Sequence, residues 1–143
     1  MRKPEREASR WFVQALDDYR FVKWVNEEKR FFDKGCFIAQ QAGEKALKAC
    51  LYAMGERRVI GHSLFEMLSE LMARDDEFRS ILEECKRLDR FYIPTRYPNG
   101  LPGGSPFEVY TKKELDEAML DLTAVIHMAE KFLITKGVKS RLQ

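Results

Sequence analysis

Arg96 is the residue whose type and neighbours best suit it to bind a phosphate group. It lies between Thr95 and Tyr97 and opens a stretch rich in proline and glycine. An arginine presents a planar fork of donors that fits phosphate or carboxylate oxygens, and a neighbouring tyrosine can stack on a base. Arg96 and Tyr97 are therefore candidate nucleotide-binding residues. The alternative is structural: Arg96 bonds to helix carbonyls or to Glu44, and Tyr97 anchors the stretch by packing.

A row of polar residues in one amphipathic segment offers further contacts for the same ligand. Gln41, Glu44, Lys45 and Lys48 recur at helical spacing opposite a stripe of small residues. We expect the stretch after Arg96 to fold back over this segment, so that its guanidinium, both lysines and Gln41 surround a phosphate. The alternative is a solvated row in which Glu44 and Lys48 form an (i, i+4) ion pair that contributes only a few tenths of a kcal/mol.

A second candidate site, of catalytic type, consists of Arg57 and His62, which have four residues between them. A histidine can act as general base on a ribose 2′-hydroxyl, and an arginine can stabilise the charge on a pentacoordinate phosphorus. Together they would cleave RNA without a metal ion. His62 can instead serve only to start the helix that Ser63 caps.

Metal and cofactor chemistry is not indicated by the sequence. There are only two histidines, no CxxC or HxxxH spacing, and three cysteines without paired spacing. The glycines from Gly100 to Gly104 lack the lysine and the following helix start of a phosphate-binding loop. We expect no metal and no cofactor, and we expect the cysteines to be small buried hydrophobes in a reducing compartment.

Helices must position these residues, because hydrophobic side chains recur at helical spacing in five segments and no strand pattern is convincing. The segments run over about residues 5–26, 33–55, from the Ser63–Glu66 capping box through 71, from 75 or 76 through 92, and from the Thr111–Glu114 capping box through 133. Short connections favour antiparallel neighbours, so we predict an all-α, up-and-down bundle of about five helices. Residues 1–143 should form one domain, with a core over about 5–135 and a basic tail over 136–143.

One connection is longer than the roughly two to eight residues usual in helical bundles. Residues 93–110 hold four of the five prolines and three glycines, without a helical pattern. The aromatic and aliphatic residues among them argue against disorder, because such groups gain by packing. We expect an ordered, extended loop that lies across the bundle before the last helix.

Charge and hydropathy exclude some classes of protein. The net charge is +2, so the whole molecule does not present a strong field to nucleic acid, although Arg57, Arg58 and the tail are locally basic. No apolar run approaches the roughly 18 residues of a membrane span. The charged start of the chain lacks the apolar region of a signal peptide. We expect a cytoplasmic protein without membrane contacts.

Four pieces of the sequence share an order and spacing with a known family. They are Gln-Gln-Ala-Gly-Glu-Lys-Ala-Leu-Lys-Ala at 40–49, Gly-His-Ser-Leu at 61–64, Leu88-Asp89, and Tyr-Ile-Pro-Thr-Arg-Tyr-Pro at 92–98. Together they resemble the HEPN domain (higher eukaryotes and prokaryotes nucleotide-binding) over about residues 5–135. The resemblance implies an intracellular all-α bundle that often forms homodimers. It also implies a minimal nucleotidyltransferase partner in two-gene modules, some of which are toxin–antitoxin systems.

The same family includes metal-independent ribonucleases that use an arginine and a histidine separated by four to six residues. Arg57 and His62 fit that spacing, but Arg57 is followed by Arg58 and an apolar pair instead of a polar residue. The pair also precedes the third helix, whereas the nuclease motif usually lies near a later one. Three functions are therefore open. We favour a dimeric module that binds a nucleotide, RNA or a nucleotidyltransferase, and the alternatives are a ribonuclease toxin and a homodimeric interaction protein without a ligand.

Overall fold

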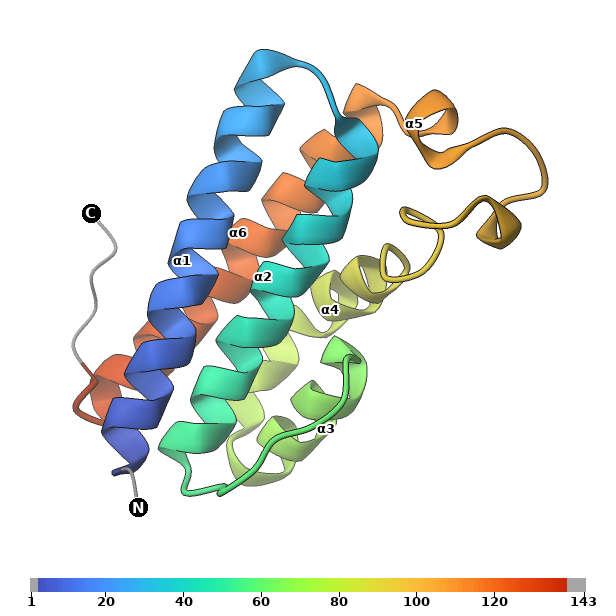
Figure 1. The fold of residues 1–143 in the computed structure, drawn as a ribbon. Helices are drawn as coiled ribbons and strands as arrows, with labels where there is room; N and C mark the ends of the chain where they lie inside the picture. The colour runs from blue at the N-terminus through green and yellow to red at the C-terminus, as the bar shows by residue number, and fades with distance from the viewer. Residues whose placement is uncertain (1–2, 139–143) are drawn as a thin grey trace.

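The structure is a computed structural model that describes residues 3–138, and every regular element in that range is a helix. Three long helices, α1 (Pro4–Glu28), α2 (Phe32–Ala53) and α6 (Lys112–Thr135), lie side by side (Figure 1). The shorter α3 (Leu64–Arg74) and α4 (Leu82–Asp89) pack on the side of α2 away from α1. The predicted all-α bundle is confirmed. No helix within residues 3–138 has the length and hydropathy needed to cross a membrane.

Local sequence signals set most of the helix ends. The Ser63 side chain accepts a hydrogen bond from the backbone of Glu66, and Thr111 forms a capping box with Glu114, both as predicted. Gly55 follows α2 with a φ of +102°, the left-handed conformation that glycine adopts without a penalty. The start of α2 differs from the prediction. The N-cap is Phe31, itself left-handed, and Asp33 is buried inside the first turn.

The element before α4 also differs from the predicted single helix. Residues from Asp76 to Ile81 form the 3-10 helix η1, and the α-helix begins only at Leu82. Asp75 caps η1 by accepting a hydrogen bond from the backbone of Glu77 at 3.0 Å. Of the residues expected to be buried here, Phe78, Ile81, Cys85 and Leu88 are buried, whereas Leu82 and Tyr92 are only partly buried.

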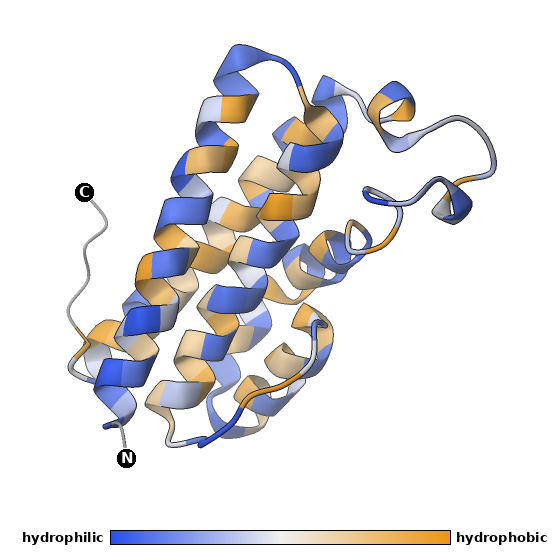
Figure 2. Ribbon diagram, viewed as in Figure 1, coloured by the Kyte–Doolittle hydropathy of each residue, from blue (hydrophilic) through white to orange (hydrophobic). Residues whose placement is uncertain are grey.

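Helix α2 is central to the bundle because its surface is made mostly of small residues. Its alanines at 39, 42, 46 and 49 are fully buried. A Cβ atom on Gly43 would lie 2.7 Å from the Cδ2 atom of Leu64, so the absence of a side chain lets α3 approach. Figure 2 shows hydrophilic and hydrophobic colours alternating along α1, as expected for a helix with one face toward a core. The small-residue stripe is thus used within the subunit.

The connection over residues 93–110 does not lie across the bundle as predicted. It projects from the end of α4 and returns to the start of α6 (Figure 1), and it contains the short helices η2 (Pro98–Gly100) and α5 (Pro106–Val109). We call residues 93–110 the arm. Its backbone closes local turns, such as Gly100 N–H to the Tyr97 carbonyl at 3.1 Å. These bonds satisfy part of the polar backbone of the arm without the bundle surface.

Candidate functional site

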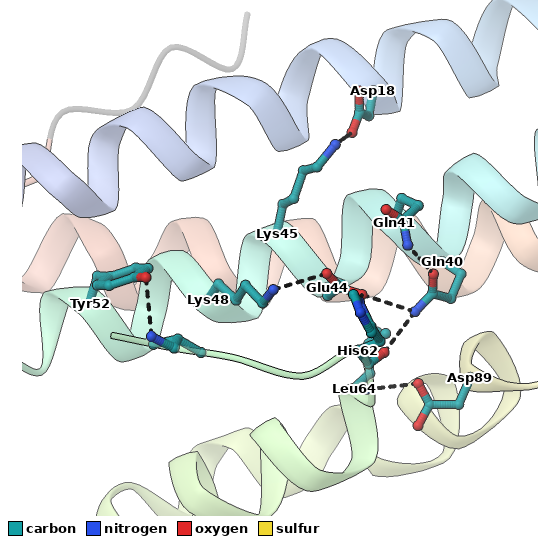
Figure 3. A network of polar contacts seen from close by, with 11 residues as sticks. Asp18, Gln40, Gln41, Glu44, Lys45, Lys48, Tyr52, His62, Leu64 and Asp89 are labelled. Carbon is teal, nitrogen blue, oxygen red and sulfur yellow. Dashed lines mark hydrogen bonds and ion pairs between the residues drawn. The ribbon is translucent and has the colours of Figure 1, made fainter. Parts of the chain in front are cut away.

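A buried carboxylate in the middle of α2 is the hub of a polar network. Glu44 is 4% exposed, and its Oε2 atom accepts a hydrogen bond from Lys48 Nζ at 3.1 Å (Figure 3). Its Oε1 atom lies 3.2 Å from His62 Nδ1 and 3.5 Å from Gln40 Nε2. Burial of a carboxylate is costly unless it is paired and hydrogen-bonded, and this one has three donors from two parts of the chain.

His62 lies on the loop between α2 and α3, with one ring nitrogen engaged and one available. An ionised carboxylate can only accept, so Nδ1 must carry the hydrogen that it donates to Glu44. In the neutral ring this leaves a lone pair on Nε2, which is the form of histidine that acts as a base. The His62 side chain is 57% exposed, and its ring stacks on Tyr92 with centroids 4.8 Å apart.

Arg96 lies in an aromatic setting beside the same tyrosine. Its guanidinium carbon is 4.5 Å from the ring centre of Tyr92, 4.7 Å from that of Phe37 and 5.1 Å from that of Tyr97. The Nε atom donates to the Tyr92 carbonyl at 2.8 Å. Arg96 and Tyr97 are both exposed. His62 and Arg96 therefore share Tyr92, and both present polar groups to solvent next to it.

The structure does not place Arg96 with Lys45 and Lys48. Lys45 donates to Asp18 on α1 at 2.6 Å, and Lys48 is buried, bonded to Glu44, with its ammonium 5.2 Å from the centre of the Trp11 ring. Arg96 contacts Phe37, which is about three turns of α2, or roughly 16 Å, from Lys48. The reason is electrostatic, because each cation has a partner of its own: Lys45 has Asp18, Lys48 has Glu44, and Arg96 has aromatic rings.

Gln41 and Arg57 have different surroundings. Gln41 donates to the side-chain oxygen of Gln40 at 2.7 Å, next to the Glu44 network. Arg57 is exposed on the loop after α2, and within residues 3–138 its side chain forms no hydrogen bond or ion pair. No hydrogen bond or ring contact joins Arg57 to His62 among residues 3–138, and the catalytic role of the pair stays a prediction.

Three contributors to this site were not identified as such from the sequence: Tyr92, Asp89 and the Glu44–His62 contact. Asp89 accepts hydrogen bonds from Ser63 and from the backbone of the next two residues. Asp89 was recognised only as part of the HEPN-like pieces, and Tyr92 only as part of those pieces and as a buried residue of the predicted fourth helix. The sequence carried little signal for them, because Glu44 belongs to the polar row expected to be solvated or to face a phosphate, and its burial is seen only in the structure.

Metal or thiol chemistry finds no support in the described residues. No group of three or more histidine, cysteine, aspartate or glutamate side chains within residues 3–138 could hold a metal ion. All three cysteines are free and buried. Burial, helped by the charges of Glu114 and Asp33, raises the pKa of Cys36 to about 12. Burial also raises the pKa of Cys50 and of Cys85. Such thiols stay protonated and unreactive at neutral pH.

The fold and the site together describe one class of protein, an antiparallel helical bundle in which a histidine contacts a buried glutamate. The HEPN domain model matches residues 8–132. The chain therefore belongs to the HEPN family, as its sequence motifs predicted.

Proteins from archaea and bacteria are similar to this chain in sequence or structure. A protein of Methanocaldococcus jannaschii that bears the name "Putative toxin MJ1304" is 25% identical over 137 residues, which is 90% of each chain. The crystal structure of TT1696 from Thermus thermophilus has a TM-score of 0.81 at 32% identity, and it covers 92% of this chain and 99% of that one. ST0689, described as an archaeal HEPN homologue, has a TM-score of 0.72 at 28% identity, with coverage of 93% and 99%.

Proposed function

We propose that this HEPN protein binds a nucleotide or an RNA strand around Tyr92, and that it works with a minimal nucleotidyltransferase in a two-gene module of toxin–antitoxin type. The relative whose name calls it a toxin supports the second part. The observation that carries the first part is the exposed guanidinium of Arg96, held on three aromatic rings beside His62. A cytoplasmic homodimer is part of the same proposal.

The chemistry of Arg96 suits a phosphate. Its Nε atom is used by the Tyr92 carbonyl, and both Nη groups are left for a ligand. Two parallel N–H donors match two phosphate oxygens, and the rings behind the guanidinium fix its plane. Tyr97 is 51% exposed and offers a surface on which a base can stack. The roles proposed for Lys45, Lys48 and Gln41 would be indirect, because each already has a protein partner.

Calorimetry with ATP, GTP and a short single-stranded RNA tests the binding proposal. Charge-assisted hydrogen bonds contribute about 1.5–3 kcal/mol, so Arg96→Ala should weaken binding at least tenfold. Arg20→Ala is the matched control, because Arg20 is an exposed arginine on α1, a helix that contributes no residue to the Tyr92 surface. Equal affinities of the wild-type protein and Arg96→Ala would remove Arg96 from the site.

A second candidate function, a metal-independent ribonuclease, is favoured by the contact between Glu44 and His62. Nε2 of His62 would take the proton of a ribose 2′-hydroxyl, the 2′-oxygen would attack phosphorus, and the 5′-oxygen would leave and gain a proton from the histidine or from water. The products are a 2′,3′-cyclic phosphate and a free 5′-hydroxyl. Arg57, as predicted from the sequence, or Arg96, which shares Tyr92 with His62, would stabilise the charge on the phosphorane.

RNA cleavage in the presence of EDTA tests this candidate. His62→Ala should abolish cleavage. His127→Ala should leave it unchanged, because His127, the second histidine of the protein, is exposed on α6. Arg57→Ala and Arg96→Ala, assayed side by side, decide which arginine takes part. Cleavage that is the same in the wild-type protein and His62→Ala, or absent from both, would rule out this function for the site.

A further inference from the structure

The backbone around His62 is held from two helices at once, which is unusual for a half-exposed loop residue. Gln40 on α2 donates from its side chain to the His62 carbonyl at 2.9 Å. On the other side, the carboxylate of Asp89 at the end of α4 accepts three hydrogen bonds. They come from Ser63 Oγ at 2.9 Å, Leu64 N–H at 2.7 Å and Phe65 N–H at 3.0 Å.

Asp89 does more than an ordinary helix cap. The cap of α3 is already supplied by Ser63, whose hydroxyl accepts from the Glu66 backbone at 3.1 Å. Asp89 accepts hydrogen bonds from the two backbone amides that this cap leaves without a partner, those of Leu64 and Phe65. It also accepts a hydrogen bond from the Ser63 hydroxyl. It does so from another helix, 26 residues after Ser63. The bonds therefore fix where the His62 segment lies relative to the end of α4, and not only whether α3 starts.

The chain that follows α4 also carries Tyr92 and Arg96, two residues of the candidate ligand site. After Asp89 the chain forms consecutive turns, with Tyr92 N–H bonded to the Asp89 carbonyl at 3.3 Å and Arg96 N–H bonded to the Ile93 carbonyl at 3.0 Å. Tyr92 stacks on His62, and its carbonyl accepts from Arg96 Nε. The segment from Asp89 to Arg96 is thus one hydrogen-bonded block that binds the three residues after His62 through Asp89 and contacts the His62 ring through Tyr92.

We propose that Asp89 is a positioning residue: by binding the hydroxyl of Ser63 and the backbone amides of Leu64 and Phe65, it holds His62 at a fixed place relative to Arg96. A ligand that contacts both the Arg96 guanidinium and Nε2 of His62 then needs no search for the correct loop conformation. Pre-set geometry of this kind matters because a displacement of about 1 Å can cost a hundredfold in rate. The consequence for binding or cleavage rests on the proposed function, whereas the geometry of His62 does not.

Nitrogen NMR of the two histidines tests the geometric part on the free protein. In the wild type, the His62 shifts should report a hydrogen on Nδ1 and a lone pair on Nε2, and in Asp89→Ala they should move toward those of a freely exchanging imidazole. Asp89→Asn keeps one oxygen acceptor and should show a smaller change. His127 is the internal reference, because it lies on α6 outside this network.

Asp75→Ala is the matched control, since Asp75 also caps a helix by accepting a backbone hydrogen bond, at the start of η1. It should lower stability without moving the His62 signals. Affinity for single-stranded RNA should fall at least tenfold in Asp89→Ala and be unchanged in Asp75→Ala. If cleavage is found, kcat/KM should fall in Asp89→Ala and be unchanged in Asp75→Ala.

The outcomes separate the two proposals. His62 signals that shift equally in Asp89→Ala and Asp75→Ala, or in neither, would overturn the positioning role. If Asp89→Ala does not fold, unchanged His62 signals in Asp89→Asn would overturn it instead. A wild-type protein that binds no nucleotide or RNA would overturn the proposed function, while the NMR comparison would still decide the role of Asp89.

Discussion

The loop that carries His62 and the arm over residues 93–110 are both irregular connections, but they are stabilised in opposite ways. The His62 loop bonds to α2 through Gln40, Glu44 and Tyr52 and to α4 through Asp89. The arm bonds mainly to itself and leaves Ile93, Tyr97 and Phe107 more than half exposed. His62, the residue proposed as a base, thus lies on the connection that bonds to two helices, and the exposed apolar groups lie on the connection that bonds mainly to itself.

The largest effect should come from removing the hub of the fixed connection. Glu44→Ala leaves the Lys48 ammonium buried without its carboxylate, and loss of one partner of a buried ion pair costs about 3 kcal/mol or more. Urea unfolding measures this loss. Asp18→Ala, which breaks the more exposed pair with Lys45, should cost about 1 kcal/mol or less. Equal losses in both variants would mean that the Glu44 network is not specially stabilising.

A smaller effect is expected where the arm joins the bundle. Arg96→Ala removes three cation–π contacts at an exposed position and should lower the free energy of unfolding by about 1 kcal/mol. Arg96→Lys keeps the charge but not the planar contact, and it should recover only part of the loss. Thermal unfolding of both variants checks the order. A loss as large as that of Glu44→Ala would show that the arm is as integral as the His62 loop.

Thiol labelling at pH 8 compares local opening in the two parts of the molecule. Cys36 lies at the start of α2 near Tyr110, at the base of the arm, whereas Cys50 lies against α6. Because burial raises the pKa of Cys36 to about 12 and that of Cys50 as well, neither thiol reacts until the structure opens. In single-cysteine variants Cys36 should react faster than Cys50. Identical rates would indicate that both open only on global unfolding.

The smallest effect should come from the tip of the arm. Phe107 is 70% exposed, so Phe107→Ser should change stability by less than about 0.5 kcal/mol. Phe12→Ser is the contrasting variant, because Phe12 is buried in the core and its loss should prevent stable folding or cost several kcal/mol, about 3 or more. A clear loss in Phe107→Ser, measured by thermal unfolding, would point to a packing contact for the arm.

Sequence patterns predicted the bundle well because its determinants are local. The capping boxes at Ser63 and Thr111, the glycine after α2 and the helical spacing of apolar residues each act within a few positions. The site was harder because its geometry depends on pairs distant in sequence. Lysine side chains are normally solvated, so Lys48 was expected at a phosphate, but Trp11 of α1 covers it. The path of the arm depends on several consecutive turns, and no single sequence motif specifies their combined direction.

A carboxylate shared among Lys48, His62 and Gln40 has a consequence for how such proteins can diverge. A change at any one of the four leaves the others with an unmet charge or donor inside the protein, so single steps are penalised. Simultaneous replacement of Glu44 and Lys48 by a well-packed apolar pair can be nearly neutral for stability. HEPN relatives that have lost the histidine should therefore tend to have lost the glutamate and the lysine together, and that joint loss would mark members that kept the bundle without this polar network.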